Sequence, residues 1–64
     1  MLTIKIMSAK NGEQIHTGKS VSFNPRNKRL AIVGVDQAIF LKEDEVAYVM
    51  NQTGKTVSVY YGKV

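Results

Sequence analysis

Lys55-Thr56-Val57-Ser58-Val59-Tyr60-Tyr61 alternates polar and apolar side chains directly after the glycine at position 54. Successive strand residues point to opposite faces of a sheet, so this two-residue period predicts a half-buried strand. Val57, Val59 and Tyr61 are expected on the core side, and Thr56, Ser58 and Tyr60 are expected to be exposed. The end of the chain therefore indicates a β fold.

The same period recurs at the beginning of the chain. Leu2 to Ser8 predicts a strand with Leu2, Ile4 and Ile6 on the core side. Asn11 and Gly12 suit the turn that follows, because both residue types accept the positive φ of a tight hairpin. The sequence therefore predicts a hairpin near the N-terminus.

The partner strand of this hairpin is expected to run from Gln14 to Phe23. The side chains expected on one of its faces are those of Ile15, Thr17, Val21 and Phe23. Gly18 interrupts the run and indicates a bulge or bend, which is a common way for a small sheet to curve.

The middle of the chain contains a turn and two further apolar runs. Asn24 to Arg29 is expected to form a turn, since Pro25 fixes φ and cannot donate a ladder hydrogen bond. Leu30 to Val35 predicts a central strand, because it is short and rich in β-branched residues. Asp36-Gln37 is then expected to turn the chain into a partner strand over Ala38 to Leu41.

The segment from Lys42 to Asn51 fits two structures. As a strand it places Val46, Tyr48 and Met50 on one face, and as a helix it groups valines and Met50 behind an acidic first turn. The strand is favoured, because valine and tyrosine prefer sheets and residues 52–54 resemble a hairpin loop. In both alternatives Glu43-Asp44-Glu45 is expected on the surface.

Six short strand-like runs without a linker predict one small β domain spanning residues 1–64. The favoured architecture is an all-β, five- to six-stranded antiparallel barrel, SH3-like as first choice and OB-like as second. An open sheet with one short helix is the third alternative. Closure is attractive because it removes the free edges along which another chain can pair.

Composition sets further expectations. The chain has 64 residues, no cysteine, a net charge of +4 and a pI near 9.6. The absence of cysteine excludes disulfides and thiolate metal sites and fits a reducing cytoplasm, where we expect the protein to be soluble. No run approaches the roughly 20 apolar residues that cross a bilayer, and no signal peptide is visible, so no membrane role is expected.

Residues that support catalysis are scarce. His16 is the sole imidazole, and we expect it to be an ordinary surface or strand-edge histidine. The serines lack an activating motif, and the contiguous acids at 43–45 cannot all converge on one ion. The scattered glycines form no phosphate loop. We therefore expect a protein that is not an enzyme and has no cofactor or metal.

A basic constellation gives the leading functional hypothesis. Arg26, Lys28 and Arg29 lie in the central turn, Lys19 precedes them, and Tyr60 is expected to be an exposed ring. Cations of this kind bind phosphates independently of base sequence, and an exposed ring can stack on a base. The sequence thus predicts a non-enzymatic accessory barrel that binds DNA or RNA through these five residues.

The alternative is a small protein-interaction module, for example an inhibitor or assembly factor. It would act through the acidic turn 43–45 or through an apolar surface. A homodimer is a further expectation, because a chain this small gains stability by burying surface against a copy of itself. Burial of Tyr60 would favour this alternative over nucleic-acid binding.

Leu41 to Gly62 joins Leu-Lys-Glu-Asp-Glu-Val-Ala-Tyr-Val to a glycine turn and an alternating strand. This rhythm resembles that of small SH3-like barrels and of LytTR-type DNA-binding domains. The resemblance covers about a third of the chain. It includes no diagnostic residue, so membership of a family is not claimed and no site residue is transferred.

Overall fold

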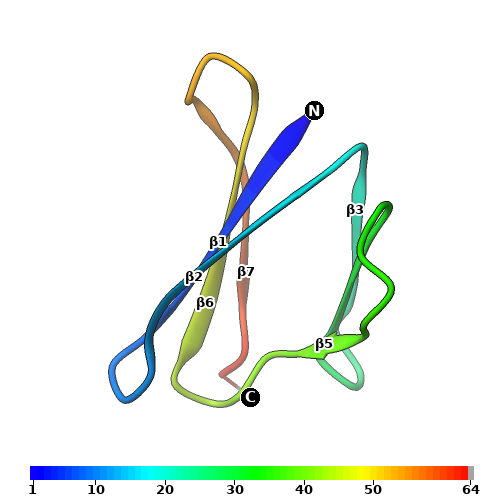
Figure 1. Ribbon diagram of the computed structural model, residues 1–64. Helices are drawn as coiled ribbons and strands as arrows, with labels where there is room; N and C mark the ends of the chain where they lie inside the picture. The colour runs from blue at the N-terminus through cyan, green and yellow to red at the C-terminus, as the bar shows by residue number, and fades with distance from the viewer. Residues whose placement is uncertain (64) are drawn as a thin grey trace.

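The protein is all-β in a computed structural model that describes residues 1–63. Its seven strands are β1 (Leu2–Ser8), β2 (Gly12–Gly18), β3 (Val21–Asn24), β4 (Arg29–Ile32), β5 (Ile39–Phe40), β6 (Glu45–Met50) and β7 (Thr56–Tyr61). One antiparallel sheet has the order β2-β1-β6-β7, and the other has the order β3-β4-β5. Figure 1 shows the first sheet on the left and the second on the right. The all-β, antiparallel prediction is confirmed, but there are seven strands, and neither sheet closes into a barrel.

A single hydrophobic core lies between the two sheets. Its buried members are Ile4, Ile6, Leu30, Ile32, Leu41, Ala47 and Val49. The alternation of β1 explains its contribution, since Ile4 and Ile6 face inward as expected. Part-buried side chains from both sheets, Phe23 and Tyr60 among them, close the margins of this core.

The predicted strand from Gln14 to Phe23 is divided between the two sheets. β2 ends at Gly18, and β3 begins at Val21 in the second sheet. A Cβ on Gly18 would overlap the Ile32 side chain and lie 2.6 Å from the Val33 carbonyl oxygen, so only glycine allows this close crossing. The expected bend is present.

This crossing also separates side chains that were expected to share a face. Ile15 is 60% exposed on the outer side of the first sheet, whereas Val21 and Phe23 pack against the core. The prediction that these side chains line one face was wrong. The chain changes sheets between them, and a two-residue period cannot continue across such a corner.

The predicted strands in the middle of the chain are shorter than expected. β4 stops at Ile32, because Gly34 adopts φ +108° and the Val35 amide donates to the Ile32 carbonyl at 3.1 Å. β5 contains two residues. The Leu41 amide donates to the Lys28 carbonyl at 2.9 Å and thereby ties the end of β5 to the β3–β4 turn.

The ambiguous segment forms strand β6, as favoured. Ala47 and Val49 are buried in it, and the opposite set of Val46, Tyr48 and Met50 lies on the outer face. Glu45 was expected on the surface, which was wrong: it is 9% exposed, and its carboxylate accepts the Lys42 amide at 2.7 Å. This hydrogen bond closes the turn before β6, and it explains why a carboxylate is tolerated there.

The final strand exists where predicted, and Thr56 is exposed as expected, but the faces of the strand are reversed from Ser58 to Tyr61. Tyr60 lies opposite the fully buried Ala47, so its ring points into the core. There it stacks on Phe23, with ring centroids 4.8 Å apart. Val57 and Tyr61 are instead exposed on the outer face. The prediction that Tyr60 is the exposed ring was therefore wrong.

Candidate interaction surfaces

Residues 1–63 contain no group of three or more His, Cys, Asp or Glu side chains arranged to hold a metal ion, and they form no pocket. Nor does this part of the chain contain a helix long and apolar enough to cross a bilayer. His16 lies on the core side of edge strand β2, opposite Ile4, with its Nε2 atom buried and without a hydrogen-bond partner in the described residues. Of the two expected alternatives, a strand-edge histidine is what the structure has, and a surface histidine was wrong, because the register turns the ring inward.

The β3–β4 turn brings together three of the four predicted phosphate-binding cations: Arg26, Lys28 and Arg29. Two asparagines order its backbone, since Asn24 Oδ1 accepts the Arg26 amide at 2.9 Å and Asn27 Oδ1 accepts the Arg29 amide at 3.0 Å. Such side-chain turns fix a loop locally. The turn is therefore an ordered cationic projection, with both arginines exposed.

Lys19 lies away from this turn. Its amide donates to the Val33 carbonyl at 3.1 Å, next to the Val21–Ile32 end of the β3–β4 hairpin, whereas the turn follows the Asn24–Arg29 end. A four-residue strand, about 13 Å long, separates the two ends. Tyr60 is also unavailable, since its ring stacks in the core. The five predicted nucleic-acid-binding residues thus reduce to a three-residue basic turn without the predicted ring.

The predicted acidic surface is divided as well. Glu43 is exposed, Glu45 is buried in its own turn, and Asp44 Oδ2 accepts the Ser8 hydroxyl at 2.7 Å. Ser8 Oγ in turn accepts the backbone amides of Lys10 and Asn11, at 3.2 Å each. Asp44 therefore fastens its turn to the β1–β2 turn, and the three acids do not form one continuous acidic patch.

Removing the Ser8 hydroxyl is expected to raise the pKa of Asp44. That hydroxyl, with backbone amides and the positive charge of Lys10, holds the Asp44 pKa below its ordinary value of 3.8. A depressed carboxyl pKa gives stability that is present above the ordinary value and is lost as the pH falls through the folded-state value. In Ser8→Ala, an NMR titration should find the Asp44 pKa closer to 3.8. The loss of stability with acid below about pH 4 should also be smaller.

The most distinctive surface is the outer face of the four-stranded sheet. We define this outer face by its apolar side chains: Met7, Ile15, Val46, Tyr48, Met50, Val57, Val59 and Tyr61. Four of them, Met7, Ile15, Val57 and Tyr61, are 43–60% exposed. They make up four of the seven large apolar side chains that are exposed among residues 1–63. The apolar surface is thus concentrated on one side of the molecule.

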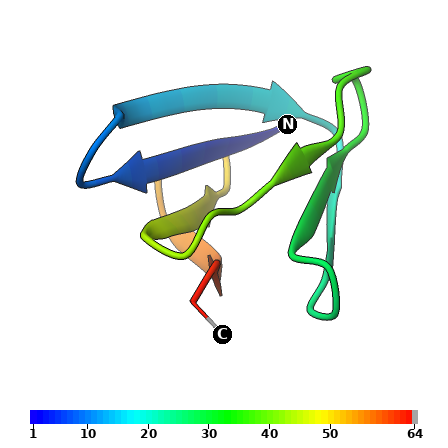
Figure 2. The same cartoon turned by 90° about the horizontal axis from the view of Figure 1, so that it is seen from below.

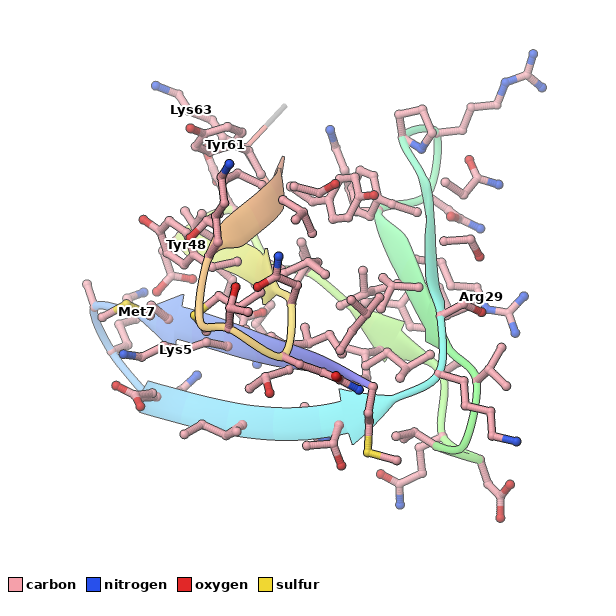
Figure 3. The ribbon with its side chains drawn as sticks, turned by 90° about the horizontal axis from the view of Figure 1, so that it is seen from above. Lys5, Met7, Arg29, Tyr48, Tyr61 and Lys63 are labelled. Carbon is pink, nitrogen blue, oxygen red and sulfur yellow. The ribbon has the colours of Figure 1, made fainter. Side chains whose placement is uncertain are left out.

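Strand register places these side chains in neighbouring rows. Ile15, Lys5, Tyr48 and Val59 lie opposite one another across the four strands, and Met7, Val46 and Tyr61 form the next row. Lys5 Nζ and Glu13 Oε2 lie 3.4 Å apart and balance each other's charge. Figure 3 shows Lys5, Met7, Tyr48 and Tyr61 along this side, with Arg29 pointing away on the opposite side.

Sequence reasoning missed this face, although its residues carry a signal. In β1 and β7 both alternating sets contain large apolar residues, such as Met7 opposite in phase to Ile6, and Tyr61 to Tyr60. A sheet with one wetted face ordinarily alternates apolar with polar residues. Strands that are apolar in both phases therefore indicate a sheet whose second face is also apolar.

No protein-family model, no curated protein and no solved structure matches this chain.

Proposed function

We propose that the protein is a small non-enzymatic interaction module that binds a protein partner on the outer face of its four-stranded sheet. The observation that carries this proposal is the concentration of exposed apolar side chains on that face. Contiguous apolar patches on small proteins commonly mark interaction sites. Tyrosine and methionine also suit such a role, because a tyrosine ring is a rigid anchor and a methionine adapts its shape to the partner.

The charge of the face favours a protein partner over nucleic acid. Lys5 and Glu13 form an ion pair within it, and its remaining polar members on the strands are threonines. Nucleic-acid sites require cations that follow a phosphate backbone. A neutral, apolar face with a polar border instead resembles the core of a protein–protein interface. The proposed partner therefore presents a complementary apolar surface.

A paired substitution tests the proposal. Val57→Lys/Tyr61→Lys places two charges on the outer face, at positions 52% and 60% exposed, so the fold should be preserved while docking is lost. Affinity capture with the full chain, from a nuclease-treated lysate of the cells that express it, should recover one stoichiometric protein with the wild type. This partner should be absent with the double variant.

Val33→Lys/Phe40→Lys provides the matched control. Both positions are 55% exposed and lie outside the outer face, so this variant removes similar apolar area and adds the same charge elsewhere. It should capture the partner as the wild type does. Equal loss with both double variants, or equal capture with both, would contradict docking on the outer face.

Nucleic-acid binding at the β3–β4 turn is the second candidate function. The ordered arrangement of Arg26, Lys28 and Arg29, in a chain of net charge +4, favours it. Three phosphate contacts predict that log affinity falls with log salt at a slope of about −3 on duplex DNA. Arg26→Ala/Arg29→Ala should abolish binding in a titration of labelled DNA and RNA, whereas the outer-face double variant should not. No binding by the wild type at low salt would exclude this function.

A further inference from the structure

Strand β2 is an open edge of the four-stranded sheet. It pairs with β1 along its full length, from Gly12 to Gly18, and no other segment of residues 1–63 pairs with its opposite side. Figure 2 shows β2 as the outermost strand, with no ribbon beyond it. A seven-residue edge is about 24 Å long, and its unpaired amides and carbonyls can receive another strand.

The other edges of the two sheets are protected or short. β7 has a register shift opposite Val49 and Met50, it is flanked by Lys55 and Lys63, and its Tyr60 contacts Phe23 of β3. β3 has four residues and β5 has two. Bulges, flanking lysines and short length are the usual devices that prevent edge pairing. β2 is also flanked by lysines, Lys10 and Lys19, but it is the longest free edge, and its seven residues include no proline, no lysine and no register shift.

We propose that β2 pairs with β2 of a second copy of this chain, antiparallel about a two-fold axis at Ile15, and joins two four-stranded sheets into one of eight strands. Isologous contacts of this kind are the commonest route to a dimer. The inference concerns the edge of the sheet, whereas the proposed function concerns its outer face. In the dimer the two outer faces become continuous across the β2–β2 junction.

The sequence of β2 is compatible with itself in this register. Gly12 meets Gly18, Glu13 meets Thr17, Gln14 meets His16, and Ile15 meets Ile15 of the second copy. All seven residues are paired, and an apolar pair occupies the axis. An axis at position 13 would instead place two glutamates directly opposite each other, which is unfavourable. Charge and length therefore both select the register at Ile15.

His16 supplies an independent observation for the same register. Its Nε2 atom is buried without a partner in the described residues, and a buried polar atom without a hydrogen bond is costly. Pairing at Ile15 brings Gln14 of the second copy opposite His16, on the same side of the sheet. The carboxamide of Gln14 has both a donor and an acceptor, so it can pair with the imidazole in either tautomer once the ring turns toward the β2–β2 junction.

Dimerisation should respond to salt in the direction opposite to nucleic-acid binding. Each chain carries a net charge of +4, but β2 contains no Lys or Arg, so the repulsion between copies comes from residues outside the contact. Salt screens such repulsion. The dimer should therefore become tighter as salt is raised.

The test measures mass by sedimentation equilibrium of the full chain between micromolar and millimolar concentrations. The wild type should show a reversible monomer–dimer equilibrium. Ile15→Glu places a carboxylate opposite Lys5 within the monomer, which is favourable, but sets two carboxylates against each other at the dimer axis. It should stay folded and dimerise at least about tenfold more weakly.

A charge-swapped mixture tests the register itself. Ile15→Lys should also be weakened alone, and mixing it with Ile15→Glu should restore a dimer that contains one copy of each. Tyr61→Glu, an equally exposed site on β7, should dimerise as the wild type does. A wild type that is monomeric throughout, a mixture without restored dimer, or equal weakening by Tyr61→Glu would each overturn the proposal.

These outcomes are separable from those of the proposed function. Val57→Lys/Tyr61→Lys leaves β2 unchanged, so it should lose the protein partner and keep the dimer. Ile15→Glu should weaken the dimer at concentrations where Val57→Lys/Tyr61→Lys still dimerises. If the edge of β2 receives a strand of a different protein instead, capture of that protein will depend on Ile15 but not on Val57 and Tyr61, while the isolated chain remains monomeric. That result contradicts the homodimer.

Discussion

Gly62→Ala is expected to remove a large share of the protein's free energy of unfolding. A Cβ at this position would overlap the Lys42 carbonyl oxygen and lie 2.8 Å from the carbonyl carbon of the same residue and 3.1 Å from that of Leu41. The obstacles are backbone atoms, which cannot rotate away as a side-chain tip can. The Gly62 amide also donates to the Glu45 carbonyl at 2.9 Å, so any shift there disturbs the start of β6.

The expected cost of this substitution is about 2–4 kcal/mol, the range of severe backbone and packing conflicts. A 64-residue domain has a free energy of unfolding of roughly 3–10 kcal/mol. Urea unfolding followed by circular dichroism measures the loss. Gly54→Ala is the matched control, since that glycine has φ +85° but open space around it, and it should lose about 1 kcal/mol. Equal losses in the two variants would show that the contact at Gly62 can relax.

Leu30→Ala should have the second large effect. Leu30 is fully buried at the centre of β4, opposite Phe23 and Ile39, and is among the largest fully buried side chains. Truncating such a side chain removes apolar burial and leaves a cavity, at a cost of about 2–5 kcal/mol. Because one core joins the two sheets, tyrosine fluorescence and circular dichroism should lose their native signals at the same denaturant concentration.

Val33→Ala is the control for Leu30→Ala, because Val33 follows the same strand but is 55% exposed. It should change the free energy of unfolding by less than about 0.5 kcal/mol. Separate transitions for the two probes in the wild type would contradict a shared core, whatever the size of the loss in Leu30→Ala.

Strand positions were largely predictable from the sequence, because they depend on local periodicity and turn residues. The β1–β2 hairpin, the Pro25 turn and strand β6 all lie where alternation and glycine placement indicated. The division of the predicted strand between two sheets at Gly18 was harder to predict from the sequence. A glycine in a strand predicts a bend, but the second sheet is created by contact with Val33, fifteen residues further along the chain.

The faces of β7 were not predictable, because alternation sorts residues into two sets without saying which set is buried. Val57, Val59 and Tyr61 are the more apolar set and were therefore expected inside. Register decides otherwise: Tyr60 lies opposite Ala47, and that small neighbour leaves room for its ring to reach Phe23. A register shift in the same hairpin, opposite Val49 and Met50, adds a residue that no periodic pattern indicates.

The division of the chain at Gly18 and the reversed faces of β7 also explain why the candidate sites were predicted only in part. The basic turn was accessible from the sequence, since Arg26, Lys28 and Arg29 are adjacent, but its supposed ring and fourth cation depended on long-range placement. The outer face could not be predicted from the sequence either, because it also depends on long-range placement. Its members come from four strands, and β1 and β6 pair residues as distant as Thr3 and Met50.

The position of β1 between β2 and β6 in the sheet also determines the order in which the fold can form during synthesis. β1 can pair with β2 early, but its other partner ends at Met50, and translation at about 5–20 residues per second delivers the intervening 42 residues (50 − 8) over roughly 2–8 s. Throughout that interval the core that covers Ile4 and Ile6 is incomplete, because Ala47 and Val49 belong to it. The nascent chain is therefore most exposed to aggregation and proteolysis before β6 emerges, and the β6–β7 hairpin completes the fold.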